Sequence, residues 1–256
     1  MYEVIKFNLN GPSAVIRKPE SNDTFFSYNN VHKIMLLGII GAIIGENGYN
    51  YDLLKSELSN NKEKKLPDFY QKLNDIKISI EPCNEMGMCS KKIQKFNNSV
   101  GYASEEVGNN LIVKEQYLEN PSWNIYILSN GTETFDKIKD YLINKKCEYI
   151  PYIGKNEHFA NIDKVEIFKA EKCDKIDGNI ASIFTDNKYD ILEGFFEFNS
   201  SLYDDVKFEY KEVLPTKLDV DIGYTDFKEF VYTNNNVKIE NPSNIYNVNG
   251  KNMFFF

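Results

Sequence analysis

The sequence predicts an α+β protein with three parts: a ferredoxin-like body, a long protruding insertion and a small β-rich part at the C-terminal end. The first observation is the order of the segments, which run strand, helix, strand, insertion, strand, helix and strand. This order is a split β-α-β, which RNA-recognition modules share. The second is a change of pattern after residue 188, where short β-type segments follow one another. We therefore expect a domain over residues 1–188, with its insertion at 82–118, and an appendage over 189–256.

The body begins with a strand and an apolar helix. Tyr2–Leu9 mixes apolar and polar residues as a strand does, and a Gly-Pro pair ends it. A loop-like stretch follows, in which Asn29 or Asn30 is placed to cap the next helix. That helix is expected over Lys33–Gly45.

Three glycines, Gly38, Gly41 and Gly45, lie along roughly one face of this helix. A glycine inside a helix costs about 1 kcal/mol relative to alanine. Something is therefore expected to approach this face closely. Tight packing on a sheet and direct contact with an RNA backbone are both open readings.

The middle of the chain combines a strand with a long insertion. Asn74–Glu81 places isoleucine at every second position, as a half-buried strand does. Residues 82–118 then lose strong periodicity and carry the basic cluster of Lys91, Lys92 and Lys95. Insertions of this length in compact domains usually serve a function. We expect a protruding hairpin.

The body ends with a strand, a helix and a strand, over Ser122–Leu128, Thr132–Lys145 and Asp163–Ala170. Thr132 or Thr134 is expected to cap the helix. The β-type segments of the C-terminal part are Phe195–Phe198, Val206–Leu214, Phe227–Thr233 and Val237–Glu240, before an apolar end.

The composition is that of a globular protein with an acidic surface. Of the 256 residues, 42% are hydrophobic and 27% are charged, which argues against disorder. The formal net charge of −8 argues against non-specific nucleic-acid binding, so RNA binding needs a local basic surface. The 17 Tyr and 18 Phe residues provide flat rings on which bases can stack.

Several classes of site lack their sequence signals. No cysteine pair has the CxxC spacing of a zinc site, and no phosphate-binding loop or nucleophile elbow is present. We expect reduced thiols, no metal and no cofactor. The longest apolar run, Ile34–Ile44, is far shorter than the ~20 residues of a membrane span, and no signal peptide is recognisable. A cytoplasmic protein without a membrane partner is expected. The cysteines are Cys83, Cys89, Cys147 and Cys173.

Arg17 is the single arginine among 30 basic residues, the others being lysine. Lysine excess fits a coding bias, so a position that keeps arginine is expected to need the planar, bidentate guanidinium. It follows a strand, beside Lys18 and a polar loop. We favour contact with a phosphate or a base, with a surface ion pair as the alternative.

Two further groups carry side chains that suit RNA. Tyr28, His32 and Lys33 lie near the start of the glycine helix, and such a set can cleave RNA without metal, contact RNA, or only cap and pack the helix. Farther on, a turn between Pro151 and Gly154 precedes Lys-Asn-Glu-His, offering a cation and an imidazole, with a solvated turn as the alternative.

Four stretches, taken in order, resemble one known family. They are Phe7–Pro19 (FNLNGPSAVIRKP), Thr24–Tyr28 with His32-Lys33 and the glycine helix, Lys114–Leu118 with Asn120-Pro121 and Tyr126, and Tyr152–His158 (YIGKNEH). Together they are similar to the fifth CRISPR-associated family of the repeat-associated mysterious proteins (RAMPs), and the N-terminal motif is similar to its type I-B branch. The resemblance covers most of residues 1–165 and thins out beyond.

The resemblance implies a non-catalytic subunit of Cascade, the type I CRISPR surveillance complex of antiviral defence. Such a subunit binds the five-prime handle of CRISPR RNA, abuts the backbone subunit and the large subunit, and meets target DNA only through the complex. The insertion would be a thumb that pins RNA or a neighbouring subunit. The matching RNA-contact positions are Arg17, Ser27, Tyr28, His32, Lys33, Lys155 and His158. To these we add Lys18, Gly41, Lys91, Lys92 and Lys95.

Two alternatives stay open. The first is a metal-independent endoribonuclease that processes the CRISPR RNA precursor, with Tyr28, His32, Lys33 and His158 as its catalytic residues. The type I-C branch is such an enzyme, with adjacent catalytic Lys and His in mid-chain, whereas the only adjacent pair here is His32-Lys33. The second alternative is a binding module unrelated to nucleic acid, which the acidic charge favours.

Overall fold

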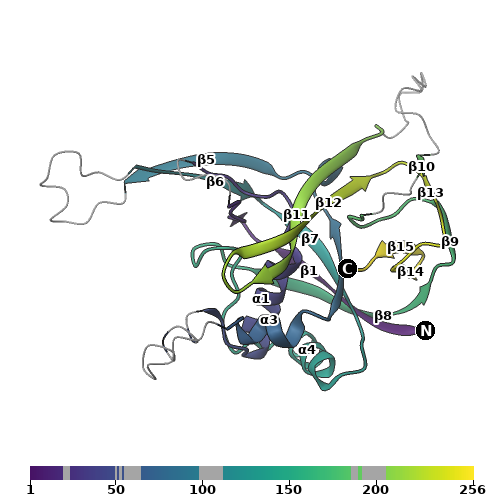
Figure 1. Ribbon diagram of the computed structural model, residues 1–256, viewed down its shortest axis with the longest axis horizontal. Coiled ribbons are helices and arrows are strands. Elements are labelled where there is room, and N and C mark those ends of the chain that lie inside the picture. Colours follow the sequence, from purple (N-terminus) through teal and green to yellow (C-terminus); the bar gives the residue numbers. More distant parts are fainter. Residues whose placement is uncertain are drawn as a thin grey trace, which may run out of the picture.

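The protein has a mixed α and β structure rich in strands. The computed structural model describes residues 1–19, 24–49, 51, 54, 65–97, 112–185, 190–191 and 206–256. Figure 1 shows helices gathered below a twisted sheet and a long two-stranded arm that projects from one side. In the described part of the chain, no helix has both the length and the apolar character of a membrane span.

The central sheet has the strand order β15-β14-β8-β1-β7-β4, and its neighbouring strands run antiparallel. Its strands are β1 (Tyr2–Asn10), β4 (Lys77–Pro82), β7 (Ser122–Leu128), β8 (Asn161–Lys172), β14 (Ile245–Val248) and β15 (Lys251–Phe254). The four strands that sequence periodicity predicted for the body are therefore neighbours, as β8-β1-β7-β4.

Three described helices accompany this sheet: α1 (Lys33–Ile44), α3 (Asp68–Leu73) and α4 (Glu133–Ile143). The alternate residues Ile5, Phe7 and Leu9 of β1 are fully buried in the same core cluster as the apolar residues of α1. Figure 1 shows α1, α3 and α4 on the same side of the sheet. The predicted order of strand, helix, strand, insertion, strand, helix and strand is confirmed.

The two predicted helix caps have different outcomes. The Thr132 hydroxyl accepts a hydrogen bond from the Phe135 backbone N–H at 3.3 Å, so Thr132 caps α4 as expected. The cap of α1 is His32, whose Nδ1 accepts from the Met35 backbone N–H, and the prediction of Asn29 or Asn30 was wrong.

The physical reason lies far away in the sequence. The Glu212 carboxylate accepts the backbone N–H groups of Asn29 and Asn30 at 2.7 and 3.0 Å, and the Asn30 amide at 3.2 Å. These asparagines thus brace the entry to α1 against the C-terminal part. The cap of α1 is therefore His32, the next residue along the chain whose side chain can accept a hydrogen bond.

The insertion forms the projecting arm. Its described strands are β5 (Ser90–Asn97) and β6 (Ile112–Glu119), which pair antiparallel after a short 3-10 turn at Glu85–Gly87. Figure 1 shows this hairpin extending away from the body. We call it the thumb. Its inner end is joined by the two short strands β2 (Ser13–Ala14) and β3 (Thr24–Phe25), which both pair with β6.

The C-terminal part is rich in strands, as predicted. It holds β10 (Asp190–Ile191), β13 (Val237–Glu240) and the hairpin of β11 (Glu209–Asp219) and β12 (Gly223–Thr233). Its β13 also pairs with β9 (Lys175–Gly178), which precedes the predicted boundary at residue 188. The predicted segment Phe195–Phe198 lies outside the described residues. The last strands, β14 and β15, continue the central sheet beyond β8, and Met253 and Phe255 pack on its face with Val4 and Tyr126. The apolar end of the chain is therefore part of the body.

Candidate nucleic-acid interface

Several of the predicted site residues meet where the thumb joins the body. We call this region the thumb base and define it by residues 13–18, 24–28, 96, 114–119 and 152–158. Backbone hydrogen bonds hold its segments together: Val15 donates to Ile153 at 3.2 Å, and Lys18 donates to the Phe26 carbonyl at 2.8 Å. Residues distant in the chain thus share one surface.

Gly154 allows the turn at 152–158 to approach this closely. Its φ of +96° lies in the region that favours glycine, and a Cβ there would stand 1.7 Å from the Val15 carbonyl oxygen. Any other residue would push the turn away from the strand that precedes Arg17. The glycine therefore sets the distance between the two predicted sites.

Arg17 is exposed and its guanidinium lies over an aromatic ring. Its guanidinium carbon is 3.7 Å from the centre of the Phe25 ring, a cation–π arrangement. Arg17 forms no ion pair with a carboxylate within the described ranges. These residues therefore give no support to the alternative of a surface ion pair. Its N–H groups have no hydrogen-bond acceptor among the residues that the structure describes, and the exposed side chain is open to a ligand.

Ser27 and Lys18 are close neighbours of Arg17. Ser27 pairs with Arg17 across an isolated bridge, and its buried hydroxyl donates to the Gln116 carbonyl at 2.6 Å. The Lys18 ammonium lies 5.0 Å from the centre of the Tyr28 ring, which is buried. Tyr28 thus presents a face to a lysine and not to solvent.

The turn that carries Lys155 and His158 is tied to the thumb base and is not freely solvated. The Lys155 ammonium forms an ion pair with Glu115 at 2.6 Å and lies 5.7 Å from the Phe96 ring. The His158 Nδ1 is 2.6 Å from the Ser13 hydroxyl. Burial lowers the pKa of His158, so its imidazole is mainly neutral at neutral pH.

The thumb carries its lysines on both faces. Because side chains alternate along paired strands, Lys91 and Lys95 share a face with Lys114, and Lys92 shares the other with Glu119. Lys92 and Glu119 form an ion pair at 2.6 Å. Lys91 donates to the Ser27 carbonyl at 3.2 Å, and burial lowers its pKa. Lys95 is exposed and extends the positive surface outward along the thumb.

Of the remaining predicted contacts, His32 and Gly41 are buried and Lys33 is half-buried. His32 is 1% exposed, and burial lowers its pKa from 6.5 to about 3, so it is neutral. Its Nδ1 caps α1, and its Nε2 has no hydrogen-bond partner among the described residues. The ring stands edge-on to Tyr28 and to Tyr224, at 5.7 and 5.0 Å between centroids. It reaches no surface from which RNA could contact it.

Lys33 and Gly41 also serve the core. The Lys33 ammonium donates to the Phe256 carbonyl at 3.1 Å, and burial lowers its pKa to about 8. Gly41 is buried, and a Cβ there would be 2.6 Å from the Cβ of Phe69 in α3. Close packing thus accounts for Gly41, although its neighbour is a helix and not a sheet.

Sequence reasoning missed the partners that orient the site. Phe25 and Phe96 supply the rings against Arg17 and Lys155, and Gln116 and Glu115 hold Ser27 and Lys155. Phe25, Glu115 and Gln116 lie within stretches that carry the family resemblance, but nothing in the sequence marked them as site residues; Phe96 had only the aromatic content of the insertion as a signal. Pairings such as Lys155 with Glu115, 40 residues apart, arise only in the fold.

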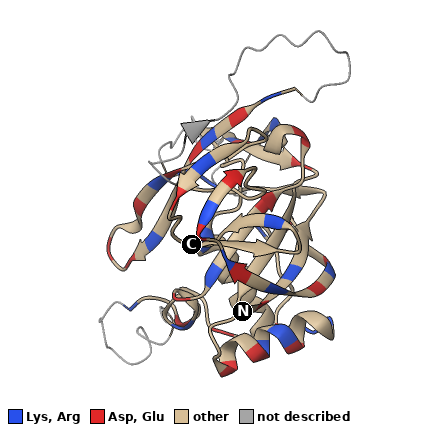
Figure 2. Cartoon of the chain, turned by 90° about the vertical axis from the view of Figure 1, so that its right-hand side faces the viewer, with Lys and Arg blue, Asp and Glu red and all other residues tan. Residues whose placement is uncertain are grey.

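Together, the thumb base offers an exposed guanidinium on a ring, further lysines along the thumb, and a neutral imidazole. Such a surface can bind a phosphate through N–H groups and stack a base on aromatic rings. Elsewhere the charge is mixed. On the side of the molecule turned away from the thumb, basic and acidic residues are interspersed (Figure 2).

No family model matches the sequence, and no curated protein matches it either. Solved structures give matches in chain trace. A chain of a CRISPR RNA-guided surveillance complex is 11% identical over 90% of each chain, with a TM-score of 0.48. A CRISPR protein from Archaeoglobus fulgidus is 10% identical over 98% of each chain, with a TM-score of 0.45. A third structure, described as a Cas protein, matches 61% of this chain and 58% of that chain at 12% identity and a TM-score of 0.37. With every TM-score below 0.5, these likenesses carry no argument about function.

Proposed function

We propose that this protein is an RNA-binding subunit of a type I CRISPR surveillance complex and that its thumb base clasps the five-prime handle of the CRISPR RNA. The observation that carries the proposal is the single arginine of the chain, stacked on Phe25 at the surface with no carboxylate partner in the described ranges. The sequence resemblance supports the finer assignment: a ferredoxin-like RAMP of the fifth CRISPR-associated family, in its type I-B branch.

The chemistry of the thumb base fits a short RNA segment. A planar guanidinium held over a ring can donate two parallel hydrogen bonds to a phosphate, which an ammonium cannot match. Phe25 and Phe96 are half-buried, so each ring keeps part of its surface for a base. The lysines of the thumb extend the positive surface beyond this contact.

The net charge of −8 is compatible with this function. A subunit that touches only a short handle needs few phosphate contacts, and acidic surfaces elsewhere discourage unspecific RNA. The isolated protein should accordingly bind random RNA weakly. By the resemblance, its partners are CRISPR RNA, the backbone subunit and the large subunit, with target DNA met only through the complex.

We further propose that the protein is not a ribonuclease. Metal-free cleavage needs a base within reach of the RNA 2′-hydroxyl. His32 is buried and bound as a helix cap, and the His158 Nδ1 is engaged by Ser13. Incubation with repeat RNA in EDTA should give no specific cleavage. Cleavage that disappears in His158→Ala would show that the protein is the enzyme instead.

The main test compares three variants of the full-length protein. Arg17→Ala should weaken binding of a handle RNA about 10- to 100-fold, since hydrogen bonds to charged groups contribute about 1.5–3 kcal/mol. Arg17→Lys should recover only part of this, because it lacks the planar fork. Lys137→Ala on the exposed face of α4 is the control and should bind as wild type does. The measurement is fluorescence anisotropy at several salt concentrations, and equal affinities for all variants would refute the role of Arg17.

A further inference from the structure

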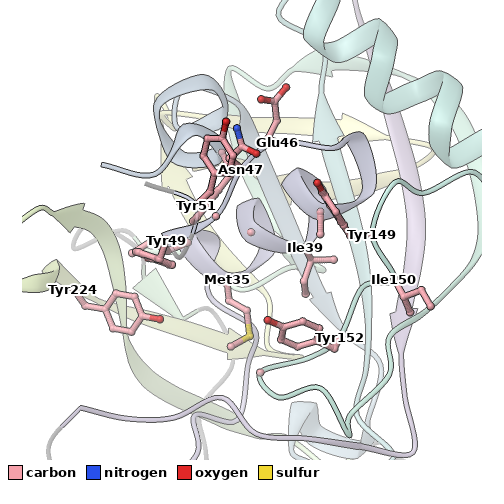
Figure 3. A pocket seen from close by; sticks show the side chains of 16 residues that line it. Met35, Ile39, Glu46, Asn47, Tyr49, Tyr51, Tyr149, Ile150, Tyr152 and Tyr224 are labelled. Atoms are coloured by element: carbon pink, nitrogen blue, oxygen red, sulfur yellow. The ribbon is translucent and has the colours of Figure 1, made fainter. Parts of the chain in front are cut away.

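A second concave site lies beside α1, away from Arg17 and Phe25. It is a pocket of about 560 Å³ between the side of α1 that carries Gly38, the segment from Tyr149 to Gly154 and Tyr224 of the hairpin β11–β12. Figure 3 shows Tyr224 and Tyr152 on opposite sides of Met35, which belongs to α1. The volume lies within the range of sites that bind ligands.

Aromatic rings dominate the lining. Gly38 contributes no side chain, which leaves the wall of α1 open, and Tyr49 stands edge-on to Phe69 at 5.7 Å. Several rings are strongly exposed, among them Tyr149 at 58% and Tyr152 at 44%. The aromatic lining residues are Tyr49, Tyr51, Phe69, Tyr149, Tyr152 and Tyr224.

Carboxylates outnumber cations among the described residues in and next to the pocket. Among its described lining residues there is no Lys, Arg or His, and Glu46 is the only charged one. Asp68 accepts a hydrogen bond from the lining residue Asn47 at 2.9 Å, and Glu148 packs against Gly45 next to Tyr149. Against these three carboxylates stands Lys72, which is paired with Glu46.

The aromatic lining and the carboxylates together indicate which kind of ligand the pocket binds. A nucleic acid would bring phosphates, and none of the lining residues that the structure describes carries a positive charge to neutralise them, while the nearby carboxylates repel them. A cation is attracted both by the carboxylates and by the faces of the tyrosine rings. The exposed apolar rim, with Ile150 at 70% exposure, is of the kind that a protein surface covers.

We propose that this pocket receives a basic side chain, lysine or arginine, from a protein partner whose apolar neighbours cover the rim. The cation lies among the tyrosine faces with Glu46 at its edge. The pocket borders the thumb base at Tyr152 and Gly154, but Arg17, Phe25 and Lys155 do not line it. Arg17→Ala should therefore weaken binding of handle RNA and leave the peptide preference of the pocket unchanged, which distinguishes failure of this inference from failure of the RNA proposal.

The test uses two fluorescein-labelled peptides, Leu-Ala-Arg-Ala-Leu and its counterpart with neutral citrulline in place of arginine. Fluorescence polarisation with the full-length protein at low salt should show about two- to thirty-fold tighter binding of the arginine peptide, as expected for a cation–π contact. Tyr152→Ala should remove this preference. Tyr152→Phe keeps the ring and should retain it, and Glu46→Gln should reduce it. Unchanged thermal midpoints confirm that the variants are folded.

Two results would overturn the inference. One is equal binding of the two peptides by the wild-type protein, failure of both to bind included. The other is binding of a single-stranded RNA oligonucleotide that falls in Tyr149→Ala, because Tyr149 lines the pocket but lies outside the thumb base, and the pocket would then serve nucleic acid.

Discussion

The glycine face of α1 allows two substitutions with opposite expected effects. Gly38→Ala and Gly41→Ala both replace a helical glycine, and each gains up to about 1 kcal/mol of helix propensity. At Gly38 the added Cβ would lie 3.8 Å from a ring carbon of Phe69, an ordinary contact. At Gly41 it would lie 2.6 Å from the Phe69 Cβ, so α3 must move.

The magnitudes follow from these distances. Gly38→Ala should stabilise the protein by about 0.5–1 kcal/mol. Gly41→Ala adds an overpacking cost of about 1–3 kcal/mol, which cancels or exceeds the gain in propensity. The free energies of unfolding of the two variants should thus differ by about 1–3 kcal/mol, or roughly 2–12 °C in thermal midpoint at about 2–4 °C per kcal/mol. Circular dichroism during urea and thermal unfolding measures both. Equal effects, or a more stable Gly41→Ala protein, would refute the packing argument.

Three further predictions concern buried groups. The pKa of His32 is about 3 in the folded protein and 6.5 in the unfolded chain, so the unfolded chain binds more protons and the free energy of unfolding falls as the pH drops below 6.5. Between pH 7 and pH 5 the wild type should lose about 2 kcal/mol more of this free energy than His32→Asn, a variant that keeps a capping oxygen. Equal losses in chemical unfolding would contradict this. Glu212→Gln keeps one acceptor oxygen for three N–H groups and should lower the free energy of unfolding in urea by about 1–3 kcal/mol. The control, Glu229→Gln at an exposed position, should change this free energy by less than about 0.5 kcal/mol. An unchanged free energy of unfolding for Glu212→Gln would disprove the bracing of α1. Gly154→Ala should lower both the thermal midpoint and the affinity for handle RNA, because the added Cβ would force the 152–158 turn away from Val15. Wild-type values for both would show that the turn does not organise the thumb base.

Local patterns predicted most of the elements of the body. The strand Ser122–Leu128 and the later strand Val237–Glu240 have the predicted bounds, and the cap at Thr132 is correct. Periodicity and capping act over a few residues, so a single sequence contains them. The thumb hairpin was predictable from the length of the insertion and its lysines.

Contacts between distant segments were not predictable. Asn29 and Asn30 are good capping residues, but Glu212 holds their backbone from more than 180 residues away. Likewise, nothing in the local pattern of Ile245–Val248 reveals that it pairs with β8. Such pairings depend on the three-dimensional arrangement and on loop closure, not on local propensity.

In the candidate site, too, local sequence features were predictable and contacts between distant segments were not. The exceptional arginine and the Gly154 turn were visible in the sequence, because both are unusual residue choices. The burial of His32 was not visible, since a histidine at a helix start can face either solvent or core. Phe25 became part of the site only through its 3.7 Å contact with Arg17.

The most direct test of the account is to identify which RNA nucleotides touch the thumb base. The protein would be purified with its native RNA, cross-linked with ultraviolet light and digested, and the cross-linked peptides and nucleotides would be identified by mass spectrometry. We predict cross-links from peptides that contain Phe25 or Phe96 to nucleotides at the five-prime end of CRISPR RNA. Cross-links that arise only from other surfaces, or that scatter along the RNA without a five-prime preference, would contradict the proposed function.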